Sequence, residues 1–158
     1  MPAKSAIAQA PRPATQLAGF LAKYSPATAA AARAVHTGIR RLVPGAVELV
    51  YDNYNGLVIG FCPSERASHA VLSIFVARDH VSICFLQNGP DLPDPTGLLR
   101  GSGNVVRHIR LESPADLDTA PVRALIKESL RRADVPIDPK GRRRLVIRSV
   151  SKRQRARR

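Results

Sequence analysis

The chain has 158 residues, of which 44% are hydrophobic and 23% charged, a balance that suits one globular domain with its own core. No stretch reaches the ~18 consecutive apolar residues of a membrane-spanning helix. The two cysteines, Cys62 and Cys84, are too few for a disulfide-built secreted domain and show no metal-ligand spacing. We therefore expect a cytoplasmic protein with reduced, buried thiols, no metal site and no cofactor.

The formal charge of +13 is distributed unevenly along the chain. Residues 140–158 contain ten Lys and Arg residues and no acid, whereas the first 139 residues contain 15 Lys/Arg against 12 Asp/Glu. A basic block of this density favours nucleic acid or another polyanion as a partner.

The first third of the chain predicts a leader and two helices. Residues 1–13 hold three prolines among small side chains and are expected to form a disordered leader. Apolar residues then follow at helical spacing up to Tyr24. Ser25 and Pro26 favour the start of a second helix, which Pro44 and Gly45 end.

The middle of the chain switches to the pattern of strands. Segments 47–52 and 57–62 flank an Asn-Gly turn, which is a strong hairpin signal. Segments 70–77 and 81–86 are apolar on both faces, which predicts central strands, and 105–111 predicts a fifth strand. A helix is expected from about Thr119 to Ala133.

This order predicts an α+β domain over residues 14–135, with an antiparallel sheet of about five strands and helices packed on one face. Residues 136–158 are expected to form a basic, flexible tail. The apolar stretch Leu145–Ile147 has the composition of a strand, but the arginines around it argue against a central position.

Three stretches, RRLVPGAVELVYDNYNGL, VLSIFVARDHVSICFLQNG and LPDPTGLLRGSGNVVRHIRL, resemble the YdhG-like family of small bacterial domains. The resemblance implies a compact α+β fold related to frataxin-like and YjbR-like folds. Some members of that family have been proposed as iron chaperones, a role that uses an acidic ridge on an early helix. This sequence has no acidic residue before Glu48.

One candidate binding site lies in the glycine-rich loop before the fifth strand. Gly101 and Gly103 can form a nest of backbone N–H groups for an anion, with Arg107 and His108 close by. The alternative is that the glycines supply positive-φ turn positions. Arg107 and His108 are neighbours on a strand, so at most one of them is expected to contact a ligand.

The second candidate is the basic tail, which we expect to contact phosphate backbones without reading sequence. The tail contains no aromatic residue, so no single-strand preference is expected from it. The predicted contact residues are Arg142, Arg143, Arg144, Lys152, Arg153, Arg155, Arg157 and Arg158.

The sequence thus favours a non-enzymatic binding module whose tail contacts nucleic acid or another polyanion. Three alternatives stay open: a solubilising tail without a partner, a frataxin-like carrier of iron or a small ligand, and an enzyme with its site at Gly101–His108. No nucleophile-elbow or paired-carboxylate motif indicates a reaction, and the oligomeric state is left open.

Overall fold

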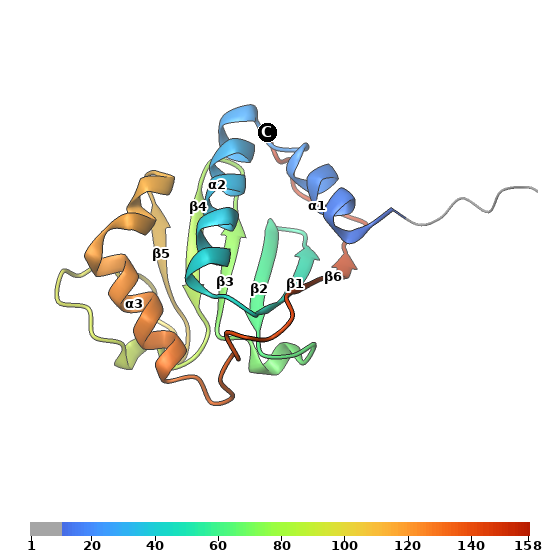
Figure 1. Ribbon diagram of the computed structural model, residues 1–158. Helices are drawn as coiled ribbons and strands as arrows, with labels where there is room; N and C mark the ends of the chain where they lie inside the picture. The colour runs from blue at the N-terminus through green and yellow to red at the C-terminus, as the bar shows by residue number, and fades with distance from the viewer. Residues whose placement is uncertain (1–10) are drawn as a thin grey trace, which may run out of the picture.

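The computed structural model describes residues 11–158, so most of the leader expected at residues 1–13 lies outside the described residues. Its last residue was assigned wrongly, because Pro13 begins the first helix. The described residues form an α+β fold in which three α-helices pack against a six-stranded sheet (Figure 1). The helices are α1 (Pro13–Leu21), α2 (Pro26–Leu42) and α3 (Ala120–Arg131). The strands are β1 (Val47–Asp52), β2 (Leu57–Cys62), β3 (Leu72–Val76), β4 (Val81–Phe85), β5 (Arg107–Leu111) and β6 (Arg144–Val150).

The break between α1 and α2 has the predicted chemistry. The Ser25 side chain accepts a hydrogen bond from the Thr28 backbone N–H at 3.3 Å, and Pro26 occupies the first helical turn. Beyond this cap, α2 turns Val35 and Ile39 into the core. The position of α2 over the sheet is therefore set by its own apolar stripe.

The sheet has the strand order β5-β4-β3-β2-β1-β6. All neighbouring strands are antiparallel except β1 and β6, which run parallel. The predicted α+β class is confirmed, and β3 and β4 are interior strands as expected. The sheet nevertheless has six strands rather than about five, and it is mixed rather than purely antiparallel.

Each face of the sheet has a different cover. One face packs into the main core, to which all three helices contribute, for example through Leu21, Ile39 and Leu125. The opposite face holds a smaller cluster built on Val47, Leu49 and Cys62, with no helical residue in it. This arrangement agrees with the prediction that the helices lie on one face of the sheet. We call the opposite face the helix-free face.

The segment expected to be a flexible tail forms the sixth strand, which corrects the sequence interpretation. Its apolar residues carry the packing, because Leu145 and Ile147 contact the main core while Val146 contacts the smaller cluster. The flanking arginines are tolerated because β6 is an edge strand with one side open to solvent. The expectation that this stretch is not a central strand agrees with that position.

A close backbone approach guides the chain into β6. Gly45, between α2 and β1, has φ +80°, and a Cβ placed there would lie 2.1 Å from the Asp138 carbonyl oxygen. The turn at residues 138–141 therefore rests directly on the α2–β1 connection. Only glycine permits both this conformation and this contact, so Gly45 helps to place β6 beside β1.

Candidate polyanion-binding surface

The residues that follow β6 stay attached to the sheet. The Ser151 N–H donates to the Asp52 carbonyl at 2.9 Å, and the Arg155 N–H donates to the Tyr54 carbonyl at 2.9 Å. The segment therefore runs along the end of β1 and the β1–β2 turn. We call residues 140–158 the basic C-terminal segment; it is anchored along its length and is not a free tail.

A buried ion cluster holds this segment in place. Asp52 has no exposed surface, and its carboxylate accepts from Lys23 Nζ at 2.7 Å and from Arg157 Nη2 at 3.1 Å. Burial raises the pKa of Asp52, but hydrogen bonds from Lys23 and other donors outweigh burial and leave the pKa below its usual value. We call Lys23, Asp52 and Arg157 the Asp52 cluster.

Arg157 was predicted to contact a polyanion, and the structure corrects that prediction. Its side chain is 4% exposed, it also donates to the Asn53 and Tyr54 carbonyls, and its guanidinium lies 5.7 Å from the centroid of the Tyr24 ring. Arg144 is in a different position, because it pairs with Glu65 at 3.2 Å while half its side chain stays exposed. Arg157 is thus an anchoring residue and Arg144 is partly neutralised.

The other cations of the segment have no ionic partner among the described residues, and residues 1–10 contain no acidic side chain. All of them are exposed. They are Lys140, Arg142, Arg143, Arg148, Lys152, Arg153, Arg155 and Arg158. An anchored strip of eight unpaired cations is suited to phosphate groups spaced along a backbone.

The β1–β2 and β3–β4 turns extend this positive surface. Arg155 lies over the Tyr54 ring, with 5.5 Å between the guanidinium carbon and the ring centroid. Arg78 and Arg155 line a pocket of about 300 Å³ between the two turns, which also includes Asp79. Tyr54 is 43% exposed, so an aromatic ring that the tail sequence lacks is supplied by a turn distant in sequence.

A second buried carboxylate lies on β1. Glu48 is fully buried and accepts from Arg40 Nε at 2.8 Å, and its other oxygen is hydrogen-bonded to His36 Nε2. Burial raises the pKa of Glu48, but the hydrogen bonds from His36 and Arg40 outweigh burial and lower the pKa overall. We call His36, Arg40 and Glu48 the Glu48 cluster; its oxygens are occupied by α2, so its role is structural.

The predicted anion loop has a different internal arrangement. The Arg107 guanidinium donates to the Gly103 and Val106 carbonyls of its own loop, so it closes the loop on itself. The turn interpretation expects a positive φ at both glycines, and only Gly101 has one, at +115°. His108 forms a backbone bridge with Arg100. Gly101, Gly103, Arg107 and His108 therefore lie close together, yet Arg107 is already engaged with carbonyl oxygens.

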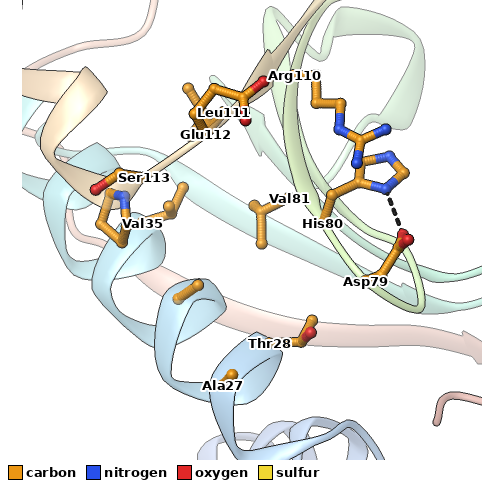
Figure 2. A pocket seen from close by; sticks show the side chains of 12 residues that line it. Ala27, Thr28, Val35, Asp79, His80, Val81, Arg110, Leu111, Glu112 and Ser113 are labelled. Carbon is orange, nitrogen blue, oxygen red and sulfur yellow. Dashed lines mark hydrogen bonds and ion pairs between the residues drawn. The ribbon is translucent and has the colours of Figure 1, made fainter.

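Polar side chains also gather in a pocket of about 200 Å³ between α2, the β3–β4 turn and the end of β5 (Figure 2). His80 Nδ1 and Asp79 Oδ1 lie 2.8 Å apart, and Arg110 stands beside His80. Ser113 lies across the pocket from His80, and its hydroxyl accepts from the Ala115 N–H. The serine therefore caps a short helix and is not paired with a base, so the pocket lacks the hydrogen bond of an activated nucleophile.

The two thiols and the acidic residues carry no further site. Cys62 and Cys84 are free, and burial raises the pKa of Cys62 to about 11 although the Arg148 charge acts in the opposite direction. Burial also raises the pKa of Cys84. Within residues 11–158, no group of three or more His, Cys, Asp or Glu side chains is placed to hold a metal ion.

Comparison with known proteins adds no identification. No family model, no curated protein and no solved structure matches this chain. None of the helices within residues 11–158 combines the length and apolarity that crossing a membrane requires. The candidate site consequently depends on the geometry of the residues alone.

Proposed function

We propose that this chain is a non-enzymatic nucleic-acid-binding protein that contacts phosphate groups through its basic C-terminal segment. One observation carries the proposal: the eight unpaired, exposed cations project from a segment that the sheet and the Asp52 cluster hold in place. Cations on an anchored segment lose less conformational entropy on binding than cations on a free tail. Their contacts release counterions from the nucleic acid, which makes the affinity depend strongly on salt.

The experiment uses charge neutralisation rather than truncation. Deleting residues 140–158 would remove strand β6 and Arg157, so lost binding would not separate charge from folding. A better variant combines Arg143→Gln, Lys152→Gln and Arg153→Gln, three exposed side chains without ionic partners within the described residues. The matched control is Arg33→Gln, Arg41→Gln and Lys127→Gln, which removes the same charge from α2 and α3.

Fluorescence anisotropy with a labelled oligonucleotide, repeated at several salt concentrations, measures both affinity and its salt dependence. We expect the C-terminal variant to bind more weakly and to lower the slope of log K against log salt by about 2 to 3. The control variant should keep a slope close to that of the unaltered chain. Equal losses in both variants would show that net charge alone is responsible and would contradict the proposal.

A further inference from the structure

The helix-free face carries a row of side chains that crosses five strands. Strand register places Tyr51 opposite Val58, Val58 opposite Phe75, Phe75 opposite Ser82, and Ser82 opposite Arg110. Directly paired residues point to the same side of a sheet, so these side chains share one face.

The two aromatic rings in this row are only partly buried. Phe61 and Phe85 belong to the main core and have no exposed surface, whereas Tyr51 and Phe75 are partly exposed to solvent. No residue of the three helices belongs to the apolar cluster on this side. These two rings therefore give a sheet face without helices flat aromatic surface that a ligand can reach.

Glycines lie beside the rings. Gly60 is on the same side of β2 as Val58, since residues two apart on a strand share a face. The Phe75 ring lies over Gly56, where a Cβ would come within 2.7 Å of it. Tyr51 and Phe75 are separated by one intervening strand, so they stand roughly 10 Å apart and offer two separate stacking positions.

The charge around these rings is positive. Arg110 is exposed at the β5 edge. Arg148 is exposed on β6 at the register shift, directly before Ser149, which pairs with Tyr51. The carboxylates of β1, Glu48 and Asp52, are enclosed by their own clusters on the helical side. The remaining acids near the row, Asp79 and Glu112, lie beyond the strand ends. Asp79 is bound by His80 and is also close to Arg110, whose charge helps to lower the Asp79 pKa.

We propose that the helix-free face binds single-stranded nucleic acid, with bases stacked on Tyr51 and Phe75 and phosphates held by Arg110, Arg148 and the basic C-terminal segment. This proposal rests on the proposed function and names the form of nucleic acid that the protein takes. Aromatic side chains stack on unpaired bases of any sequence, whereas the bases of a duplex are already stacked on one another. Arg110 lies at the β5 end of the row and Arg148 next to its β6 end, so one extended strand can contact both the rings and these charges.

The test compares three variants on four probes: an unstructured single-stranded DNA 15-mer, the corresponding RNA 15-mer, a duplex of the same length, and heparin. The aromatic variant carries Tyr51→Leu and Phe75→Leu. Its control carries Phe20→Leu, which removes one partly buried ring on α1, 5.3 Å from the Lys23 ammonium, and leaves the Lys23–Asp52 ion pair its own partners. The third variant is the triple C-terminal Gln substitution described above.

We expect the aromatic variant to lose roughly 5- to 150-fold in affinity for the single strand per ring removed. Its affinity for duplex and heparin should stay within twofold of the unaltered chain, as should that of Phe20→Leu on all probes. The C-terminal variant should weaken on every probe. The DNA and RNA arms distinguish which single strand is preferred.

The possible failures are distinguishable. If the unaltered chain binds none of the probes, the proposed function fails together with this inference. If duplex and single strand bind equally well and the aromatic variant is unaffected, the inference is overturned while polyanion binding stands. Because Phe75→Leu can disturb the sheet, a conservative pair, Tyr51→Phe and Phe75→Tyr, should retain single-strand affinity.

Ultraviolet cross-linking of the unaltered chain provides a second measurement that needs no substitution. We expect cross-linked single strand on peptides that contain Tyr51 or Phe75. Cross-links confined to residues 140–158 would overturn the inference.

Discussion

The two buried carboxylates of β1 have the same burial but different partners. Glu48 and Asp52 are both fully buried and lie four residues apart on the helical side of one strand. The Glu48 cluster draws its cations from α2, at His36 and Arg40, directly before the strand. The Asp52 cluster draws them from Lys23 and from Arg157, which is 105 residues away in sequence.

The Glu48 cluster is therefore a local contact of β1, and the Asp52 cluster is a long-range one. Glu48 ties β1 to the helix that precedes it, a contact between neighbours in the chain. Asp52 ties β1 to the basic C-terminal segment and thereby holds the cations of the proposed binding surface. The arginines of the two clusters also differ in exposure, because Arg40 is 28% exposed and Arg157 is 4% exposed.

The largest expected effect comes from breaking the long-range cluster. In the variant Asp52→Asn, the Arg157 guanidinium stays buried without a carboxylate, and one of its atoms, Nε, already lacks a hydrogen-bond partner within the described residues. We expect the free energy of unfolding to fall by about 3–5 kcal/mol, measured by urea denaturation. Affinity for nucleic acid should fall as well, because the segment loses its anchor.

A double variant sharpens this prediction. Replacing Arg157 with Met as well as Asp52 with Asn removes both buried charges, and such apolar replacements are often neutral or stabilising. We expect the double variant to regain part of the lost stability. A double variant that is less stable than Asp52→Asn alone would contradict the interpretation that the unpaired cation causes the loss.

A smaller effect is expected at the local cluster. The variant Glu48→Gln keeps one oxygen for Arg40, and this arginine can turn toward solvent because it is only partly buried. We expect a loss of about 1–3 kcal/mol in the free energy of unfolding, with nucleic-acid affinity unchanged. A loss larger than that of Asp52→Asn, measured in the same urea series, would contradict the expectation that the Asp52 cluster stabilises the fold more than the Glu48 cluster.

Sequence reasoning predicted the parts of this fold whose signals are local. The Ser25-Pro26 cap, the Asn55-Gly56 hairpin and the apolar stretches of β3 and β4 each carry their own pattern within a few residues. Strand β6 was not predicted because its partner strand, β1, lies nearly 100 residues earlier in the sequence. The charge of the β6 segment also resembles that of a disordered tail.

The same distinction applies to the candidate site. The basic character of residues 140–158 could be read from composition, but the burial of Arg157 could not, since its partner is Asp52. Tyr51 and Phe75 were treated as strand residues, and only the register places them on one row. The sequence carries no period-2 signal for these two rings, because residues on both faces of β1 and β3 are buried.

The smallest expected effect is the loss of stability at acid pH, where the carboxylates of the two clusters become protonated. The pKa values of Glu48 and Asp52 are both lowered in the folded chain, so each contributes stability above its unfolded pKa. That contribution is lost as pH falls below the unfolded values and through the lower folded ones. We expect urea midpoints to stay nearly constant from neutral pH to about pH 5 and then to decline.

The two amide variants test whether these carboxylates account for the decline. Each of Asp52→Asn and Glu48→Gln lacks one of the titrating groups, so each should lose less stability on acidification than the unaltered chain does. This difference between curves is expected to be smaller than the loss that either substitution causes at neutral pH. Curves that run parallel to that of the unaltered chain down to pH 3 would assign the acid sensitivity to other carboxylates. Both clusters would then stabilise the fold through hydrogen bonding and packing without contributing to its pH dependence.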